Sequence, residues 1–122
     1  MRLSSIGKSL RMDRIFGEDH RTVVIVMDYG GFQGPAPEWE DPAPKIEAVV
    51  EGGADAIMIT FGLAERYSKL AKGKSSVILS VPLPDEGMEE TVRLALKAGV
   101  DALKTFLILG TADEPRVLGN HW

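Results

Sequence analysis

The residue best placed for chemistry is an aspartate that directly follows a run of apolar residues. Five consecutive apolar residues, Val23–Met27, precede Asp28, and a glycine-rich stretch follows it. The C-terminal end of a buried parallel strand is where ligands bind, both in open sheets and in barrels. A carboxylate at that end could act as a general acid or base toward a bound substrate. The alternative is an Asx-turn residue that only ends the strand; position alone leaves both interpretations open.

The stretch after Asp28 and the end of the next apolar run offer candidate ligand contacts. Backbone amides at Gly30 and Gly31 could approach an anion, but the stretch lacks the G-x-G-x-x-G spacing and runs into prolines instead of a helix. An active-site loop is therefore favoured over a phosphate cradle. Thr60 ends the second apolar run and Ser80 lies near the end of the third. Either hydroxyl could line the same mouth, although such residues more often cap a helix or form a turn. We predict substrate binding by Gly30, Gly31 and Thr60.

Lys104 is unusual because it lies inside the apolar run 102–109. A lysine in a buried strand is costly unless it is paired or neutral, and a neutral amine is a nucleophile toward carbonyl groups. Inside a barrel, Lys104 could pair with Asp28 or bind a substrate anion. At an open sheet edge it could instead extend its ammonium group into water. These roles stay open, and we take Asp28 and Lys104 as candidate catalytic residues.

Four apolar, partly β-branched runs alternate with amphipathic segments, which predicts strands and helices in turn. The predicted strands are 22–27, 56–60, 76–81 and 102–109. The predicted helices begin at Asp41-Pro42, cover 63–71 and begin at Asp85, with a fourth opened by the capping box Thr111 to Glu114. Such alternation indicates an α/β fold with a parallel sheet and helical crossovers.

A weak internal repeat supports this fold. The segment 52–56 (GGADA) recurs as 98–102 (AGVDA), each time between a helix and a strand. Glycine can end the helix in the left-handed conformation, and the aspartate can turn the chain into the strand. The apolar strand 23–27 needs cover on both faces; helices can cover one, and the inward side chains of an eight-stranded barrel the other. We expect a partial (β/α)8 TIM barrel of about four βα units.

Composition excludes several classes of protein. At 122 residues, the chain is one domain and well short of the roughly 250 residues of a complete barrel. The net charge of −4 argues against a nucleic-acid binder. The absence of cysteine and the wide separation of His20 and His121 argue against a metal site. No apolar run approaches the ~18 residues of a membrane span. We expect a cytoplasmic protein with no metal and no cofactor.

The first 21 residues lean basic, and a transit peptide is conceivable there. The spacing of Leu3, Ile6 and Leu10 instead favours a helix with one apolar stripe that packs on the domain. We therefore divide the chain into an N-terminal helical segment, 1–21, and a (β/α)4 half-barrel, 22–122.

Several segments in order resemble the DeoC/LacD-type aldolases, above all the archaeal-type class I fructose-bisphosphate aldolases. These segments are 4–8 (SSIGK), 14–16 (RIF), 23–30, 52–60 (GGADAIMIT) and 99–110 (GVDALKTFLILG) with 111–114 after it. The resemblance covers nearly the whole chain, but only the N-terminal half of such a barrel. Tyr29 stands where the family commonly has histidine, so the role of the loop is less certain.

The resemblance implies a lyase of carbohydrate metabolism that makes or breaks C–C bonds in phosphorylated sugars through a Schiff base. It places the first-strand carboxylate on Asp28. Lys104 resembles a fourth-strand lysine of some relatives, whereas the family's Schiff-base lysine lies on strand six, outside this chain. We therefore predict a truncated aldolase-like protein whose partner is a small phosphorylated sugar or related carbonyl substrate; whether this chain itself catalyses a reaction stays open.

Two other interpretations remain. One is a non-catalytic half-barrel subunit that binds a partner chain, as a homo-oligomer or with a complementary half-barrel, because a half-barrel exposes apolar surface and strand edges. The other is a flavodoxin-like domain, which the chain length would suit. Four strands in place of five, and no acidic cluster after strand 76–81, argue against it.

Overall fold

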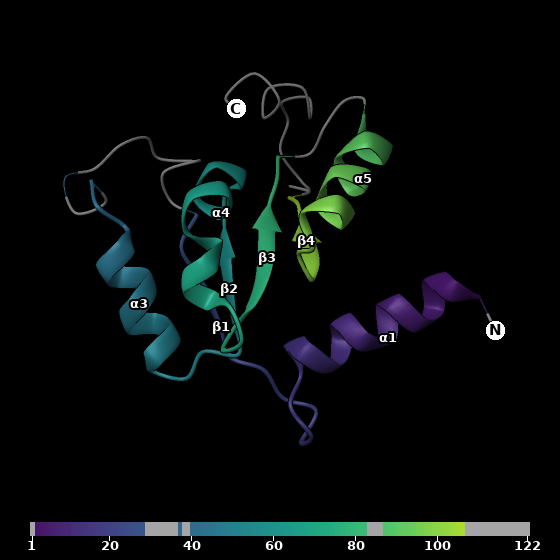
Figure 1. The fold of residues 1–122 in the computed structure, drawn as a ribbon, viewed down its shortest axis with the longest axis horizontal. Coiled ribbons are helices and arrows are strands. Elements are labelled where there is room, and N and C mark those ends of the chain that lie inside the picture. Colours follow the sequence, from purple (N-terminus) through teal and green to yellow (C-terminus); the bar gives the residue numbers. More distant parts are fainter. Residues whose placement is uncertain (1, 29–36, 38–39, 83–86, 107–122) are drawn as a thin grey trace, which may run out of the picture.

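A computed structural model describes residues 2–28, 37, 40–82 and 87–106. Its elements, in order, are α1 (Leu3–Ile15), β1 (Val24–Val26), α3 (Ala43–Glu51), β2 (Ala56–Ile59), α4 (Phe61–Tyr67), the 3-10 helix η2 (Ser68–Ala71), β3 (Ser76–Ser80), α5 (Met88–Ala98) and β4 (Ala102–Lys104) (Figure 1). Within these ranges the strands form one parallel sheet in the order β1-β2-β3-β4. This is the predicted α/β fold, a partial βα barrel.

The strand order settles one of the alternatives. Each strand pairs with the strand that follows it along the chain, with a helix between them. A flavodoxin-like sheet has the order 2-1-3-4-5, because its chain reverses direction after the first crossover. A sheet that winds in one direction only is instead the arrangement that curves toward a barrel.

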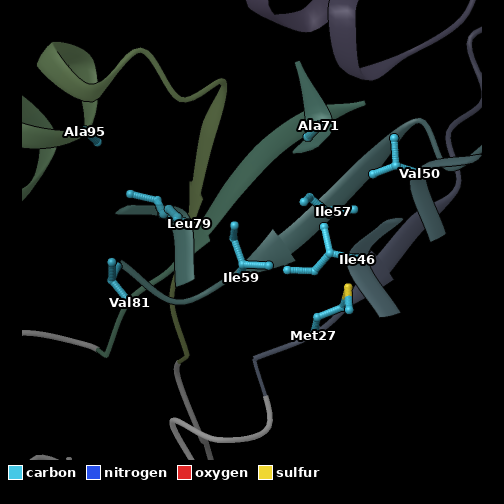
Figure 2. Close-up of a cluster of buried hydrophobic side chains, with 10 residues drawn as sticks. Met27, Ile46, Val50, Ile57, Ile59, Ala71, Leu79, Val81 and Ala95 are labelled. Atoms are coloured by element: carbon cyan, nitrogen blue, oxygen red, sulfur yellow. The ribbon is translucent and has the colours of Figure 1, made fainter. Parts of the chain in front are cut away.

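The core lies between the sheet and the helices. Its buried side chains alternate along the strands, so that one face of each strand turns toward the helices. Met27, after β1, lies beside Ile46 of α3, and Ile57 and Ile59 of β2 extend the same layer (Figure 2). Leu79 of β3 continues it toward α5. Met27 is therefore oriented toward the helices.

The other face of the sheet has no helix among the described residues. Val26, Met58, Ile78 and Ala102 lie on this face, in one row across the four strands. Of these, Ile78 is buried, whereas Val26 keeps 40% of its surface exposed. This face corresponds to the interior of a barrel.

The repeated segments build the same connection twice. Gly53 (φ 92°) and Gly99 (φ 78°) adopt the left-handed conformation just after α3 and α5, as predicted. Each aspartate then bonds twice to a single residue of the neighbouring strand. Asp55 accepts from the Val23 amide through its carboxylate (2.7 Å) and donates its own amide to the Val23 carbonyl (3.0 Å).

Asp101 repeats this arrangement on Val77, with distances of 3.1 and 2.9 Å. We call this pair of bonds the aspartate clamp. The aspartates therefore do more than turn the chain, because they fix the register of β1 with β2 and of β3 with β4.

Several element boundaries differ from the predictions. The strands are shorter than predicted, with ends at Val26, Ile59, Ser80 and Lys104, and residues 107–109 of the predicted fourth strand lie outside the described residues. The predicted helix 63–71 divides into α4 and the 3-10 helix η2. Asp41 accepts from the Ala43 amide (3.2 Å) at the start of α3, as predicted. Asp85 and the segment 111–114 lie outside the described residues, and α5 begins after Gly87.

The N-terminal helix forms, but its predicted apolar contacts do not. Leu3 is 86% exposed and Leu10 is 54% exposed, so the stripe faces away from the half-barrel. The helix is instead held at its C-terminal end. There Ile15 is buried, and the Ser76 hydroxyl donates to the Arg14 carbonyl (2.9 Å). No helix in the described ranges is long and apolar enough to span a membrane.

Candidate functional site

Three polar side chains from three strands meet at the C-terminal end of the sheet. Lys104 is the last residue of β4, Ser80 is the last of β3, and Asp28 follows β1. The Lys104 ammonium donates to Asp28 Oδ2 at 3.0 Å and to Ser80 Oγ at 3.1 Å. Of the roles that the sequence left open for Lys104, pairing with Asp28 is the one observed.

The register explains why these residues meet. Lys104 is aligned directly with Ser80 across β3 and β4. Asp28 lies two residues beyond Val26, which is aligned with Met58 of β2, so it falls at the same level of the sheet. A separation of two residues also returns a side chain to the same face. All three side chains therefore point to the face without helices, at the mouth of the half-barrel.

The site is partly enclosed. The Asp28 side chain is 4% exposed and that of Lys104 is 24% exposed, so Lys104 is the more accessible of the two. The Lys104 nitrogen also lies 3.4 Å from the centroid of the Phe106 ring. A carboxylate, a hydroxyl acceptor and an aromatic face all stabilise the charged ammonium. The arrangement holds the Lys104 ammonium at the mouth and restricts the directions in which its N–H groups point.

The other predicted ligand contacts have different outcomes. The Thr60 hydroxyl accepts from the Leu63 amide (3.4 Å), so it caps α4. Thr60 nevertheless lies one residue beyond Ile59, which is aligned with Leu79, and so shares the level of Ser80. Gly30 and Gly31 lie outside the described residues. Substrate binding by these three residues stays a prediction.

Phe106 was not predicted to belong to the site, whereas Ser80 was considered as a residue that could line the mouth. A polar residue at the end of the strand beside Lys104 shares its level in a parallel sheet. Phe106 was hidden within an apolar run that predicted a continuous strand. In the described part of the chain, no group of three or more His, Cys, Asp or Glu side chains is placed to hold a metal ion.

Comparison with known proteins points to one kind of enzyme. No protein-family model matches the chain. It is 26% identical to an uncharacterized aldolase of Saccharolobus solfataricus, over 89% of this chain and 45% of that protein. It is 29% identical to a 2-amino-3,7-dideoxy-D-threo-hept-6-ulosonate synthase of Halobacterium salinarum, over 93% of this chain and 45% of that protein. The chain is a distant relative of aldolases.

This relationship agrees with the fold and confirms the expected aldolase resemblance at that level. The chain spans a little under half the length of each of these two relatives. The finer assignment to the DeoC/LacD type stays a prediction.

Proposed function

We propose that the chain is the first half of a class I aldolase barrel of the DeoC/LacD type, and that Lys104 and Asp28 act together on a carbonyl substrate. The observation that carries the proposal is the 3.0 Å contact between the Lys104 ammonium and Asp28, at the strand ends where barrels bind ligands. The substrate is a small phosphorylated sugar or a related carbonyl compound.

In this proposal the two residues share one proton transfer. The Lys104 ammonium donates a hydrogen bond to the carbonyl oxygen of the substrate. Asp28 takes the proton from the neighbouring carbon. The electron pair of that C–H bond forms a carbon–carbon double bond, and the π pair of the carbonyl moves onto its oxygen to give an enolate. The ammonium stabilises this negative charge where it forms. Such electrostatic stabilisation by a preorganised donor is usually the largest single contribution to catalysis. Return of the proton to carbon restores the substrate.

Lys104 is not the Schiff-base lysine of this proposal. An amine attacks a carbonyl only when it is unprotonated, whereas Lys104 acts in this proposal as a hydrogen-bond donor, as it does toward Asp28 and Ser80. The resemblance places the Schiff-base lysine on a sixth barrel strand, and the described residues form only the first four.

The test is exchange of carbon-bound hydrogen in dihydroxyacetone phosphate, followed by proton NMR in D₂O. We expect the chain to speed deuterium incorporation beside the carbonyl above the buffer rate. Asp28→Asn and Lys104→Met should each lower the protein-dependent rate by roughly 100-fold, within the range for loss of one acid–base group. Lys72→Met, a lysine outside the site, serves as the matched control.

Equal rates with the protein and with buffer alone would reject this activity. The second candidate, a non-catalytic half-barrel subunit that binds a partner chain, would then be favoured. Its support is specific: the inner face of the sheet carries the exposed Val26, and among the described strands β1 and β4 each pair on one side only.

A further inference from the structure

We infer that a second copy of this chain docks edge to edge on the first, with β4 of each copy beside β1 of the other, so that two copies close one eight-stranded barrel. The inference concerns assembly and does not depend on aldolase chemistry. It rests on the register of the sheet, one buried hydroxyl group and the charges at the two edges.

The aspartate clamps define which residues of the two halves of the sheet are equivalent. Asp55 clamps Val23 and Asp101 clamps Val77, so Val77 takes the place of Val23 in the repeat. By the same count, Ser76 is equivalent to Thr22 and Ala102 to Ala56. The sheet is thus built from two similar units, β1-β2 and β3-β4.

The register between these units gives the stagger of the sheet. Val24 is aligned with Ala56, and Ala56 is aligned with Ser76 of β3. The residue of β3 equivalent to Val24 is Ile78, which lies two residues further along. Each two-stranded unit therefore shifts the register by two residues.

This stagger is the one that an eight-stranded barrel needs. Closure of a sheet into a barrel fixes the total shift, and a (β/α)8 barrel has eight strands and a shear of 8. Four units with a shift of two residues each supply that value. One copy supplies two units, and a second copy supplies the remaining two with no change in geometry.

The same repeat predicts the contact between the copies. The new junction, β4 with β1 of the second copy, is equivalent to the junction of β2 with β3. Because Ala56 is aligned with Ser76 there, Ala102 should be aligned with Thr22 of the second copy. Both residues lie on the inner face. Thr22 is four residues from Val26 and Ala102 is two residues from Lys104, and an even separation along a strand keeps side chains on the same face.

A buried hydroxyl at this edge supports the docking. Thr22 Oγ1 is buried and has no hydrogen-bond partner among the described residues. Its equivalent, Ser76, donates to the Arg14 carbonyl of α1. Buried polar groups are normally hydrogen-bonded, and an orphaned one costs stability. Helix α1 extends past β4 (Figure 1), so in the closed ring α1 of the second copy passes below Thr22 of the first.

The charges at the two edges are complementary. Helix α1 presents Lys8 and Arg11 along the groove that it forms with α5 and β4. At the opposite edge, α3 presents the exposed Glu47 and Glu51. Edge-to-edge docking brings the basic helix of one copy to the acidic helix of the other, which favours this orientation over its reverse.

Closure has a consequence for the mouth of the barrel. The twofold axis of the ring coincides with the barrel axis, so the two clusters of Asp28, Ser80 and Lys104 face each other across one opening. A single copy has half of that wall. The enclosed mouth exists only in the pair.

The sharpest test uses engineered cysteines, because the natural chain has none. In a chain that carries both Thr22→Cys and Ala102→Cys, the two positions lie three strands apart, roughly 14 Å across the sheet at ~4.8 Å per strand, and four residues, about 13 Å, apart along the strands. That distance is too long for a disulfide within one chain. In the closed pair they lie on neighbouring strands. We expect quantitative covalent dimers under mild oxidation, with the 22–102 bond identified by peptide mass spectrometry.

The matched control carries Val26→Cys with Ala102→Cys. Val26 lies four residues from Thr22 on the same face, about 13 Å along the strand, so this pair should remain uncrosslinked. Equal crosslinking of both pairs, or a dimer without the 22–102 bond, would overturn edge-to-edge docking.

The unmodified chain gives an independent measurement. Light scattering at micromolar concentration should give twice the 13.3 kDa mass of one chain. Lys8→Glu with Arg11→Glu should weaken the dimer at least tenfold, and Glu47→Lys with Glu51→Lys in the same chain should restore it. A monomer at 100 µM would overturn the inference and would favour a different chain as the complementary half-barrel.

Discussion

Lys104 joins two strands that are not neighbours. The residue lies on β4, and Asp28 follows β1, so their ion pair spans the curved inner face across β2 and β3. Ser80 supports the lysine from the strand between. A long cationic side chain that crosses the interior in this way holds β1 and β4 of the curved sheet together. It also places its charge at the mouth.

The proposed role of Lys104 as a hydrogen-bond donor leads to a prediction about covalent trapping. Incubation with dihydroxyacetone phosphate and borohydride should leave the protein unmodified, because an ammonium does not attack a carbonyl. Intact-mass spectrometry measures this directly. Stoichiometric addition, mapped to Lys104 by peptide analysis, would show that the half-barrel forms its own Schiff base and would overturn the role given to this residue.

The ion pair should also contribute to stability. Asp28→Ala removes the partner of a lysine that is three-quarters buried, and we expect a loss of about 1–3 kcal/mol, below the range for a fully buried pair because Lys104 can move toward water. Lys104→Met should change stability by less than about 1 kcal/mol in the Asp28→Ala background.

A double-mutant cycle in urea isolates the interaction. A coupling energy indistinguishable from zero would mean that the pair does not hold the sheet together.

At the residue scale, the sequence identified the two charged groups but not their relation. An aspartate after an apolar strand and a lysine inside another are visible in the sequence. Whether they meet depends on strand order and stagger, which involve pairings between residues that are distant along the chain. The sequence indicated that Ser80 could line the mouth but not that it contacts Lys104, and Phe106 was missed because it lies within an apolar run.

At the element scale, the aspartate clamps are the feature that positions the site. They set the register of β1 with β2 and of β3 with β4 at the N-terminal ends of the strands. The register then carries through each strand to its C-terminal end, where Asp28, Ser80 and Lys104 come to one level. A short repeat at one end of the sheet therefore determines which side chains meet at the other.

Removal of one clamp should lower the free energy of unfolding. Asp55→Ala deletes a 2.7 Å charge-assisted bond to the Val23 amide, and we expect a loss of about 1–2 kcal/mol. The matched control is Asp41→Ala, whose carboxylate accepts a longer, exposed bond at the start of α3 and should cost less than about 1 kcal/mol. Urea denaturation compares the free energies of unfolding of the two variants. Equal losses would mean that the clamp stabilises the fold no more than the bond at the start of α3.

The elements themselves were largely predictable, because their signals are local. Alternating apolar runs gave the strands, and the glycines at 53 and 99 gave the helix ends. The errors involve tertiary context. The stripe of α1 suits a packed helix, but Leu3 and Leu10 are exposed among the described residues. The observed anchoring of the helix is at its C-terminal end, where Arg14 and Ile15 contact the half-barrel.

At the scale of the whole molecule, the sheet has the stagger of a closed barrel but only part of its circumference. One face is covered by α3, α4 and α5, which surround a continuous apolar core. The other face is the interior of a barrel whose mouth carries one ammonium group. The proposed aldolase chemistry would take place at this mouth, and the inferred closure by a second copy would complete its walls.

The most direct test of this account is whether the Lys104 ammonium binds substrate oxygen at the mouth. Proton–carbon NMR of the chain labelled with ¹³Cε-lysine, titrated with dihydroxyacetone phosphate, reports on every lysine separately, and the Lys104→Met variant assigns its peak. We predict a saturable shift of the Lys104 peak, with Lys8, Lys72 and Lys74 unchanged, and loss of the effect in Asp28→Asn. An unmoved Lys104 peak, or equal shifts at all lysines, would contradict the account.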